Sequence, residues 1–124
     1  MTVAYWCVLV MIIFPYLFAT LAKASLSFNN AKPREYAAAL TGWRQRANYI
    51  QLNSFEALST FGLAVIIAHL AHASQINVDR LAIIYVISRA IYAICYLAKT
   101  SMLRTFFWSI GFFCIIGLFY ISAL

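Results

Sequence analysis

Four long apolar stretches, separated by short polar segments, run along the 124-residue chain. They cover about residues 3–26, 44–73, 78–98 and 105–124. A helix needs about 20 mostly apolar residues to cross the hydrocarbon core of a bilayer, and each stretch meets that length. The pattern therefore predicts an all-α fold, an integral membrane four-helix bundle with up-down topology, as one domain over residues 1–124.

The polar segments predict the connections. Residues 28–43 form the longest of them, where Asn29-Asn30 and Lys32-Pro33 indicate a turn and residues 35–40 add a helical turn along the surface. No Lys or Arg precedes the first apolar stretch, so we interpret it as a retained span and not as a cleaved signal peptide. Before the third span, Asn77 or Asp79 is the expected helix cap.

Composition supports the membrane assignment and sets an orientation. Only 10% of the residues are charged, against about 25% in soluble domains, and the net charge is +6. The basic residues adjoin apolar stretches and form no soluble patch, so no nucleic-acid partner is predicted. They gather at the first and third connections, which we therefore expect on the cytoplasmic side, with both termini opposite. These residues are Lys23, Lys32, Arg34, Arg44, Arg46, Lys99 and Arg104.

A polar stripe runs along the second span. At about 100° per residue, its members fall within an arc of about 80° on the helix. Polar groups inside a membrane face protein or a wet cavity and not lipid, so this stripe marks a candidate site. The residues are Arg46, Tyr49, Asn53, Glu56 and Thr60.

The third span carries a second polar stripe. The two stripes carry charges of opposite sign at a similar depth in the membrane. Glu56 and Arg89 each lie about 15 Å from the basic end of their helix. Because an unpaired charge in the bilayer is costly, we predict that they pair, within or between subunits. The pair is either an ionic clasp that fixes helix register or part of a polar ligand site. The second stripe comprises Tyr85, Ser88, Arg89, Tyr92, Tyr96 and Lys99.

Metal chemistry is not predicted. His69 and His72 are three residues apart, a spacing that can share one metal, but no third ligand except Asp79 lies nearby in the sequence. The three cysteines all lie inside apolar stretches, which is typical of buried apolar side chains. There is no phosphate-binding glycine loop and no signature of a nucleophile with its base.

Two segments together resemble a known family. The first is Gly42-Trp43-Arg44-Gln45-Arg46-Ala47, leading to Gln51-Leu52-Asn53-Ser54-Phe55-Glu56-Ala57, and the second is Arg89-x-x-Tyr92-x-x-x-Tyr96 followed by Lys99 and Arg104. They are similar to the second- and third-helix signatures of the MAPEG family, the membrane-associated proteins of eicosanoid and glutathione metabolism. Residues 30–34 resemble the loop of its bacterial branch.

The resemblance implies a homotrimer with a glutathione site between subunits on the cytoplasmic side. The short loops and the lack of a targeting signal are typical of a bacterial inner membrane protein. The resemblance also implies a glutathione-dependent transferase or peroxidase that acts on apolar electrophiles or lipid hydroperoxides. Arg104 would be the catalytic residue, because a nearby cation lowers the pKa of a thiol and favours the thiolate. Glutathione, as co-substrate, would be held by Arg46, Asn53, Glu56, Arg89, Tyr92 and Tyr96.

One position leaves the activity open. Enzymatic members of the family commonly have arginine where this chain has Tyr49, and Arg44 or Arg46 is the only nearby substitute. A non-catalytic, lipid-presenting member also lacks an arginine there. The alternative is therefore a non-enzymatic protein that binds a lipid or apolar ligand, or that serves as an accessory subunit of a membrane complex.

Overall fold

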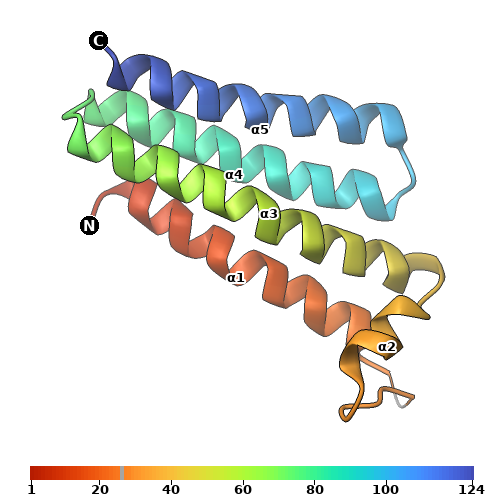
Figure 1. Cartoon of the computed structure of the whole chain (residues 1–124). Helices are drawn as coiled ribbons and strands as arrows, with labels where there is room; N and C mark the ends of the chain where they lie inside the picture. The colour runs from red at the N-terminus through yellow and green to blue at the C-terminus, as the bar shows by residue number, and fades with distance from the viewer. Residues whose placement is uncertain (26) are drawn as a thin grey trace.

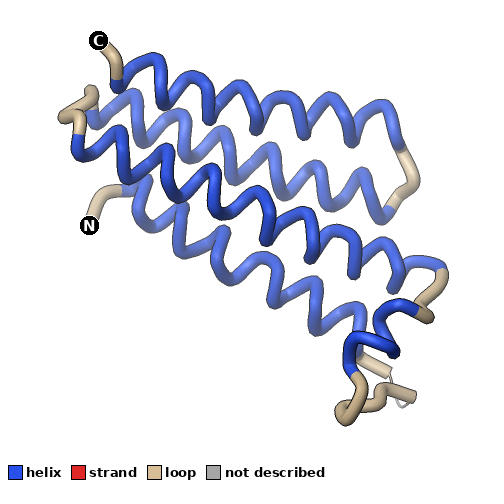
Figure 2. Tube along the Cα trace, in the orientation of Figure 1, coloured by secondary structure: helices blue, strands red, loops and turns tan. Residues whose placement is uncertain are grey.

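Five helices account for most of the chain. The computed structural model describes residues 1–25 and 27–124. Within them lie α1 (Val3–Lys23), α2 (Pro33–Ala38), α3 (Gly42–Leu70), α4 (Gln75–Leu97) and α5 (Ser101–Ser122). Figure 2 shows that the segments between them are short loops, and no strand occurs in the described ranges. The all-α prediction is confirmed.

Four of these helices are long and apolar enough to cross a membrane: α1, α3, α4 and α5. Helix α3 has 29 residues, which at 1.5 Å per residue makes it about 43 Å long. The hydrocarbon core is about 30 Å thick, so α3 extends beyond it. Helix α1 passes through Pro15 without interruption, and residue 26, the expected last residue of the first span, lies outside the described residues.

The four long helices form an up-down bundle (Figure 1). Helix α1 packs against α3 and α4, α5 packs against α4 and α3, and α3 also contacts α4. Both termini and the α3–α4 turn lie at one end, here called the terminal end (Figure 1). Helix α2 and the α4–α5 turn lie at the other, here called the α2 end, so the basic connections share one end as the sequence predicted.

Apolar side chains fill the space between α1, α3, α4 and α5. The ring of Phe61 on α3 stacks on the ring of Tyr85 on α4, with centroids 4.0 Å apart and planes 6° apart. Around them lies the larger of two apolar clusters, while the smaller cluster is nearer the α2 end. The larger cluster consists of Ala4, Met11, Phe61, Ala64, Val65, Ala68, Val78, Ala82, Tyr85, Cys114 and Leu118.

Polar side chains fasten the start of α1 at the terminal end. The Ala4 amide donates a 2.9 Å hydrogen bond to Asp79 Oδ1. The expectation that Asn77 or Asp79 caps α4 was wrong: α4 begins at Gln75, so both residues lie inside the helix. The Asp79 carboxylate instead accepts from the first turn of α1. Thr2 Oγ1 lies 2.8 Å from His69 Nε2, and the His69 ring stacks on Tyr5 with centroids 4.0 Å apart.

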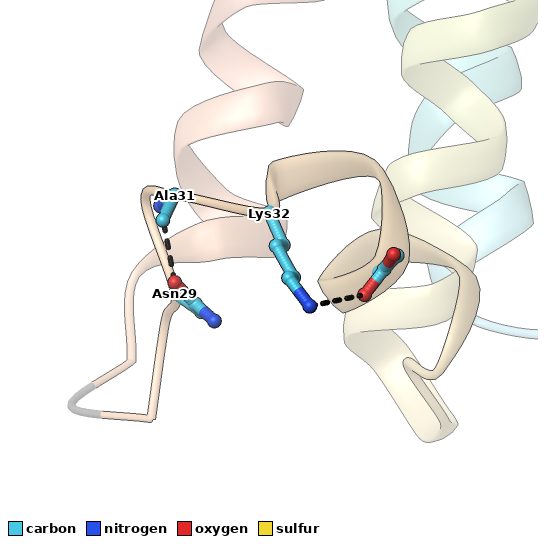
Figure 3. Close-up of polar contacts among 4 residues, drawn as sticks. Asn29, Ala31 and Lys32 are labelled. Atoms are coloured by element: carbon cyan, nitrogen blue, oxygen red, sulfur yellow. Dashed lines mark hydrogen bonds and ion pairs between the residues drawn. The ribbon is translucent and has the colours of Figure 1, made fainter.

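The α2 end is built from the long polar connection (Figure 3). The Ala31 amide donates a 3.0 Å hydrogen bond to Asn29 Oδ1, which closes the predicted turn. Lys32 Nζ lies 3.9 Å from Glu35 Oε2 across the surface of α2. Arg44 Nη2 donates to the Ala24 carbonyl at 2.6 Å, and this bond joins the end of α1 to the start of α3.

The fourth span differs from its prediction in a way that matters for the site. Helix α5 begins at Ser101, four residues before the expected boundary. The Arg104 amide therefore donates to the Thr100 carbonyl at 3.0 Å, as the first turn of a helix requires. Arg104 thus lies on a helix, and not in the third connection as the sequence suggested.

Candidate functional site

A crevice opens in the middle of the bundle where α3, α4 and α5 meet. Its volume is about 270 Å³. One side is polar, with side chains from the two predicted stripes, and the other is the apolar face of α5. The lining residues are Asn53, Glu56, Ala57, Thr60, Tyr85, Arg89, Trp108, Gly111, Phe112 and Ile115.

Arg89 is the charged group at the base of this crevice. It is only 2% exposed, although arginine is rarely buried without a partner. Its Nη2 donates a 2.5 Å hydrogen bond to Asn53 Oδ1, and its guanidinium carbon lies 4.3 Å from the centre of the Tyr92 ring. The buried Nε has no hydrogen-bond partner among the described residues.

Glu56 also lines the crevice but does not pair with Arg89 inside the chain. In the described part of the structure, no nitrogen–oxygen contact within 4.0 Å joins Glu56 to Arg89. The ion pair found there is between Lys32 and Glu35. Residues three positions apart on a helix point about 60° apart, so when Asn53 faces Arg89, Glu56 points to the outer edge of the crevice. The predicted clasp is therefore not formed within one subunit.

A second hollow, of about 230 Å³, lies closer to the α2 end. It is lined by Tyr92, Tyr96, Arg104, Thr105 and Trp108. The guanidinium carbon of Arg104 lies 4.6 Å from the centre of the Tyr96 ring, and Tyr92 and Tyr96 pack edge to face with centroids 5.8 Å apart. We call this the Arg104 hollow. It unites three of the predicted site residues.

The Arg104 hollow suits a negatively charged group. Its cation stands in the first turn of α5, where unpartnered backbone amides and the helix dipole add positive potential. The Tyr96 ring holds the guanidinium by cation–π contact, an interaction worth about 0.5–2 kcal/mol depending on desolvation. Tyr hydroxyls can also donate hydrogen bonds. An anion such as a carboxylate or a thiolate therefore meets several complementary groups here.

Two residues of the predicted stripe lie outside both spaces. Arg46 is half-buried and lines neither, and its Nε has no partner among the described residues. Tyr49 is 43% exposed, and its ring centre lies 6.4 Å from that of Tyr96. Neither the crevice nor the Arg104 hollow receives a cation from the part of α3 that precedes Asn53.

Sequence reasoning missed the contribution of α5 beyond Arg104. Arg104, Trp108, Gly111 and Ile115 are spaced at i, i+4, i+7 and i+11, so they share one face of the helix. This face forms the second wall of both spaces. The spacing is visible in the sequence, but its members are mostly apolar and look like ordinary membrane-facing residues.

Comparisons with known proteins agree with the architecture. A family model described as the MAPEG family matches residues 3–124. The searches of curated proteins and of solved structures gave no match. The family match covers nearly the whole chain, including all four helices capable of crossing a membrane. The chain is therefore a multi-pass membrane protein and belongs to the MAPEG family.

Proposed function

We propose that the protein is a membrane-embedded, glutathione-dependent transferase or peroxidase. Membership of the MAPEG family supports a glutathione-related membrane function. The observation that carries the finer proposal is the position of Arg104, a helix-borne cation in a hollow that adjoins the apolar wall of the crevice. Such a site brings an anionic sulfur and an apolar molecule together.

In this proposal glutathione lies along the polar side of the two spaces. Its carboxylates complement the cation of Arg89 and the amide of Asn53. Its amino group complements the carboxylate of Glu56. Tyr92 and Tyr96 flank it, and its thiol lies near Arg104. Arg46 would contribute only from outside both spaces, at the entrance on the α2 end.

Arg104 would act by stabilising the thiolate. A nearby guanidinium lowers the pKa of a thiol, and the thiolate is the reactive nucleophile. In transfer, the sulfur forms a bond to an electrophilic carbon while the leaving group departs with its electron pair. With a lipid hydroperoxide, the sulfur takes the terminal oxygen, the alcohol is released, and a second glutathione yields the disulfide and water.

The remaining features follow the same proposal. The protein is a homotrimer, and each exposed Glu56 is covered by a neighbouring subunit. The α2 end faces the cytoplasm, where glutathione is available, since this end carries the basic connections. The membrane is a bacterial inner membrane.

Calorimetry with glutathione on the detergent-solubilised protein tests the proposal. We expect binding, together with thiolate absorbance in the near ultraviolet. Arg104→Ala should abolish the thiolate absorbance and keep most of the affinity, whereas Arg34→Ala, which removes an exposed cation from α2, should change neither. The absence of heat at millimolar glutathione would refute the enzymatic proposal.

Tyr49 favours a second candidate function. An arginine at this position would supply a cation beside Tyr96, but the chain presents an exposed phenol there. The protein would then be a non-enzymatic lipid-binding or accessory subunit. Binding of a spin-labelled fatty acid without any binding of glutathione would support this alternative. Restoring the cation with Tyr49→Arg would then be expected to introduce glutathione binding.

A further inference from the structure

One residue borders both spaces of the candidate site. Trp108 lines the mid-bundle crevice and also the Arg104 hollow. The other residues of the two linings are different: Tyr92, Tyr96, Arg104 and Thr105 occur only in the hollow. The indole therefore stands between two compartments with different chemistry.

The indole has a defined position and is partly exposed. Its ring is stacked nearly parallel to that of Phe112, with centroids 5.5 Å apart and planes 6° apart. Trp108 is 43% exposed in the single chain. It follows Arg104 by one helical turn, about 6 Å along the axis, so a group held at Arg104 lies beside the indole.

From this arrangement we propose that Trp108 is the residue that determines which acceptors reach the thiol. This inference rests on the proposed function. An acceptor whose reactive atom lies at Arg104 extends its apolar part past the indole and into the crevice, along the wall made by Phe112 and Ile115. The Trp108–Phe112 stack offers a flat face to unbranched or planar apolar groups, and the indole obstructs bulky ones because it lies between the two spaces. The acceptors are therefore straight-chain or planar electrophiles.

S-substituted glutathiones test the selectivity, because each carries its apolar group on the sulfur. We expect the wild type to bind S-hexylglutathione at least about tenfold more tightly than S-tritylglutathione, a ratio within the range that apolar pockets achieve. Trp108→Ala should remove most of this difference by raising the affinity for the trityl compound relative to that for glutathione. Trp108→Phe should be intermediate, and Trp6→Ala, on α1, should behave as wild type.

Two results of this experiment would contradict the inference. Equal losses of affinity for glutathione and for both derivatives in Trp108→Ala would show that the indole only supports packing. Unchanged affinities for all three compounds would show that no ligand passes the indole. The absence of glutathione binding by the wild type would refute the proposed function. A second measurement then tests whether the Trp108 indole lies between the two compartments.

The second measurement needs no glutathione. In a variant with Trp6→Phe and Trp43→Phe, Trp108 is the single tryptophan. A residue that separates the two compartments should be quenched by brominated acyl-chain lipid from the membrane and by iodide, which the Arg104 cation attracts, from the water. Quenching by the lipid alone would place the indole on the bilayer face. Quenching by neither would place it beneath another subunit, and both results would overturn the inference.

Discussion

Removing the acceptor that Asn53 offers to Arg89 should destabilise the bundle strongly. Arg89 is 2% exposed and its Nη2–Asn53 Oδ1 bond is 2.5 Å long, so Asn53→Ala leaves a buried cation without its neutralising dipole. A hydrogen bond to a charged group contributes about 1.5–3 kcal/mol. We expect a loss of about 2–3 kcal/mol in the free energy of unfolding. Asn48→Ala, which removes a half-buried asparagine of the same helix, should cost less than about 1 kcal/mol.

Combining the change with one at Arg89 gives the sharper test. Arg89→Met keeps a long side chain but removes the charge, and replacing a buried ion by an apolar group is often neutral or stabilising. Once the cation is gone, the loss of the Asn53 acceptor matters little. The double variant Asn53→Ala/Arg89→Met should therefore be more stable than the sum of the single effects predicts, by about 2 kcal/mol.

The cycle can be measured by titrating the purified protein from mild detergent into SDS and following helicity by circular dichroism. Each variant needs a reversible transition, and refolding by dilution verifies this. Strictly additive losses would show that Asn53 and Arg89 do not interact in the folded protein. An Asn53→Ala effect no larger than that of Asn48→Ala would lead to the same conclusion.

Three further perturbations probe other contacts. A Cβ on Gly111 would lie 3.2 Å from Ser88 Oγ, whereas one on Gly62 would meet nothing within 4 Å. Gly111→Ala should therefore lower the free energy of unfolding by about 1–3 kcal/mol by overpacking. Equal effects of Gly111→Ala and Gly62→Ala in SDS unfolding would refute the tight approach of α5 to α4. Asp79→Asn should lower the unfolding free energy by about 1 kcal/mol, because a charged acceptor at the start of α1 becomes neutral; faster hydrogen exchange at the first turn of α1 is the readout, and unchanged exchange would contradict it. Glu56→Gln should weaken the proposed trimer, measured by cross-linking at rising detergent concentration, and unaltered cross-linking would argue against a cation from a neighbouring subunit.

The number, order and up-down arrangement of the four long helices followed from the sequence because membrane spans leave a strong hydrophobic signal. Helix boundaries were harder. Helix α5 starts at Ser101 because backbone hydrogen bonding continues to Thr100, and polar residues in a first turn conceal this from a hydropathy pattern. The partner of Asp79 could not be predicted either, since its acceptor role depends on how the start of α1 docks against α4.

The candidate site was predicted in part. Helical periodicity correctly placed Asn53, Glu56 and Arg89 around one crevice. It predicted that Glu56 pairs with Arg89, whereas within the chain Asn53 contacts the guanidinium. The two α3 side chains point about 60° apart on the helix. Trp108 was missed for a different reason: an aromatic residue in an apolar helix has no distinctive signal until neighbouring helices define what lies on each side of it.

The fastening of α1 at the terminal end bears on how the protein is made. The hydrogen bond between Ala4 and Asp79 joins residues 75 positions apart, and Thr2 contacts His69 across 67 positions. Helix α1 leaves the ribosome before α3 and α4, yet the groups that secure its leading turn are synthesised only with the end of α3 and the start of α4. These bonds at the start of α1 consequently form only after α3 and the first turns of α4 have been made, and any factor that shelters nascent spans would be needed throughout that delay.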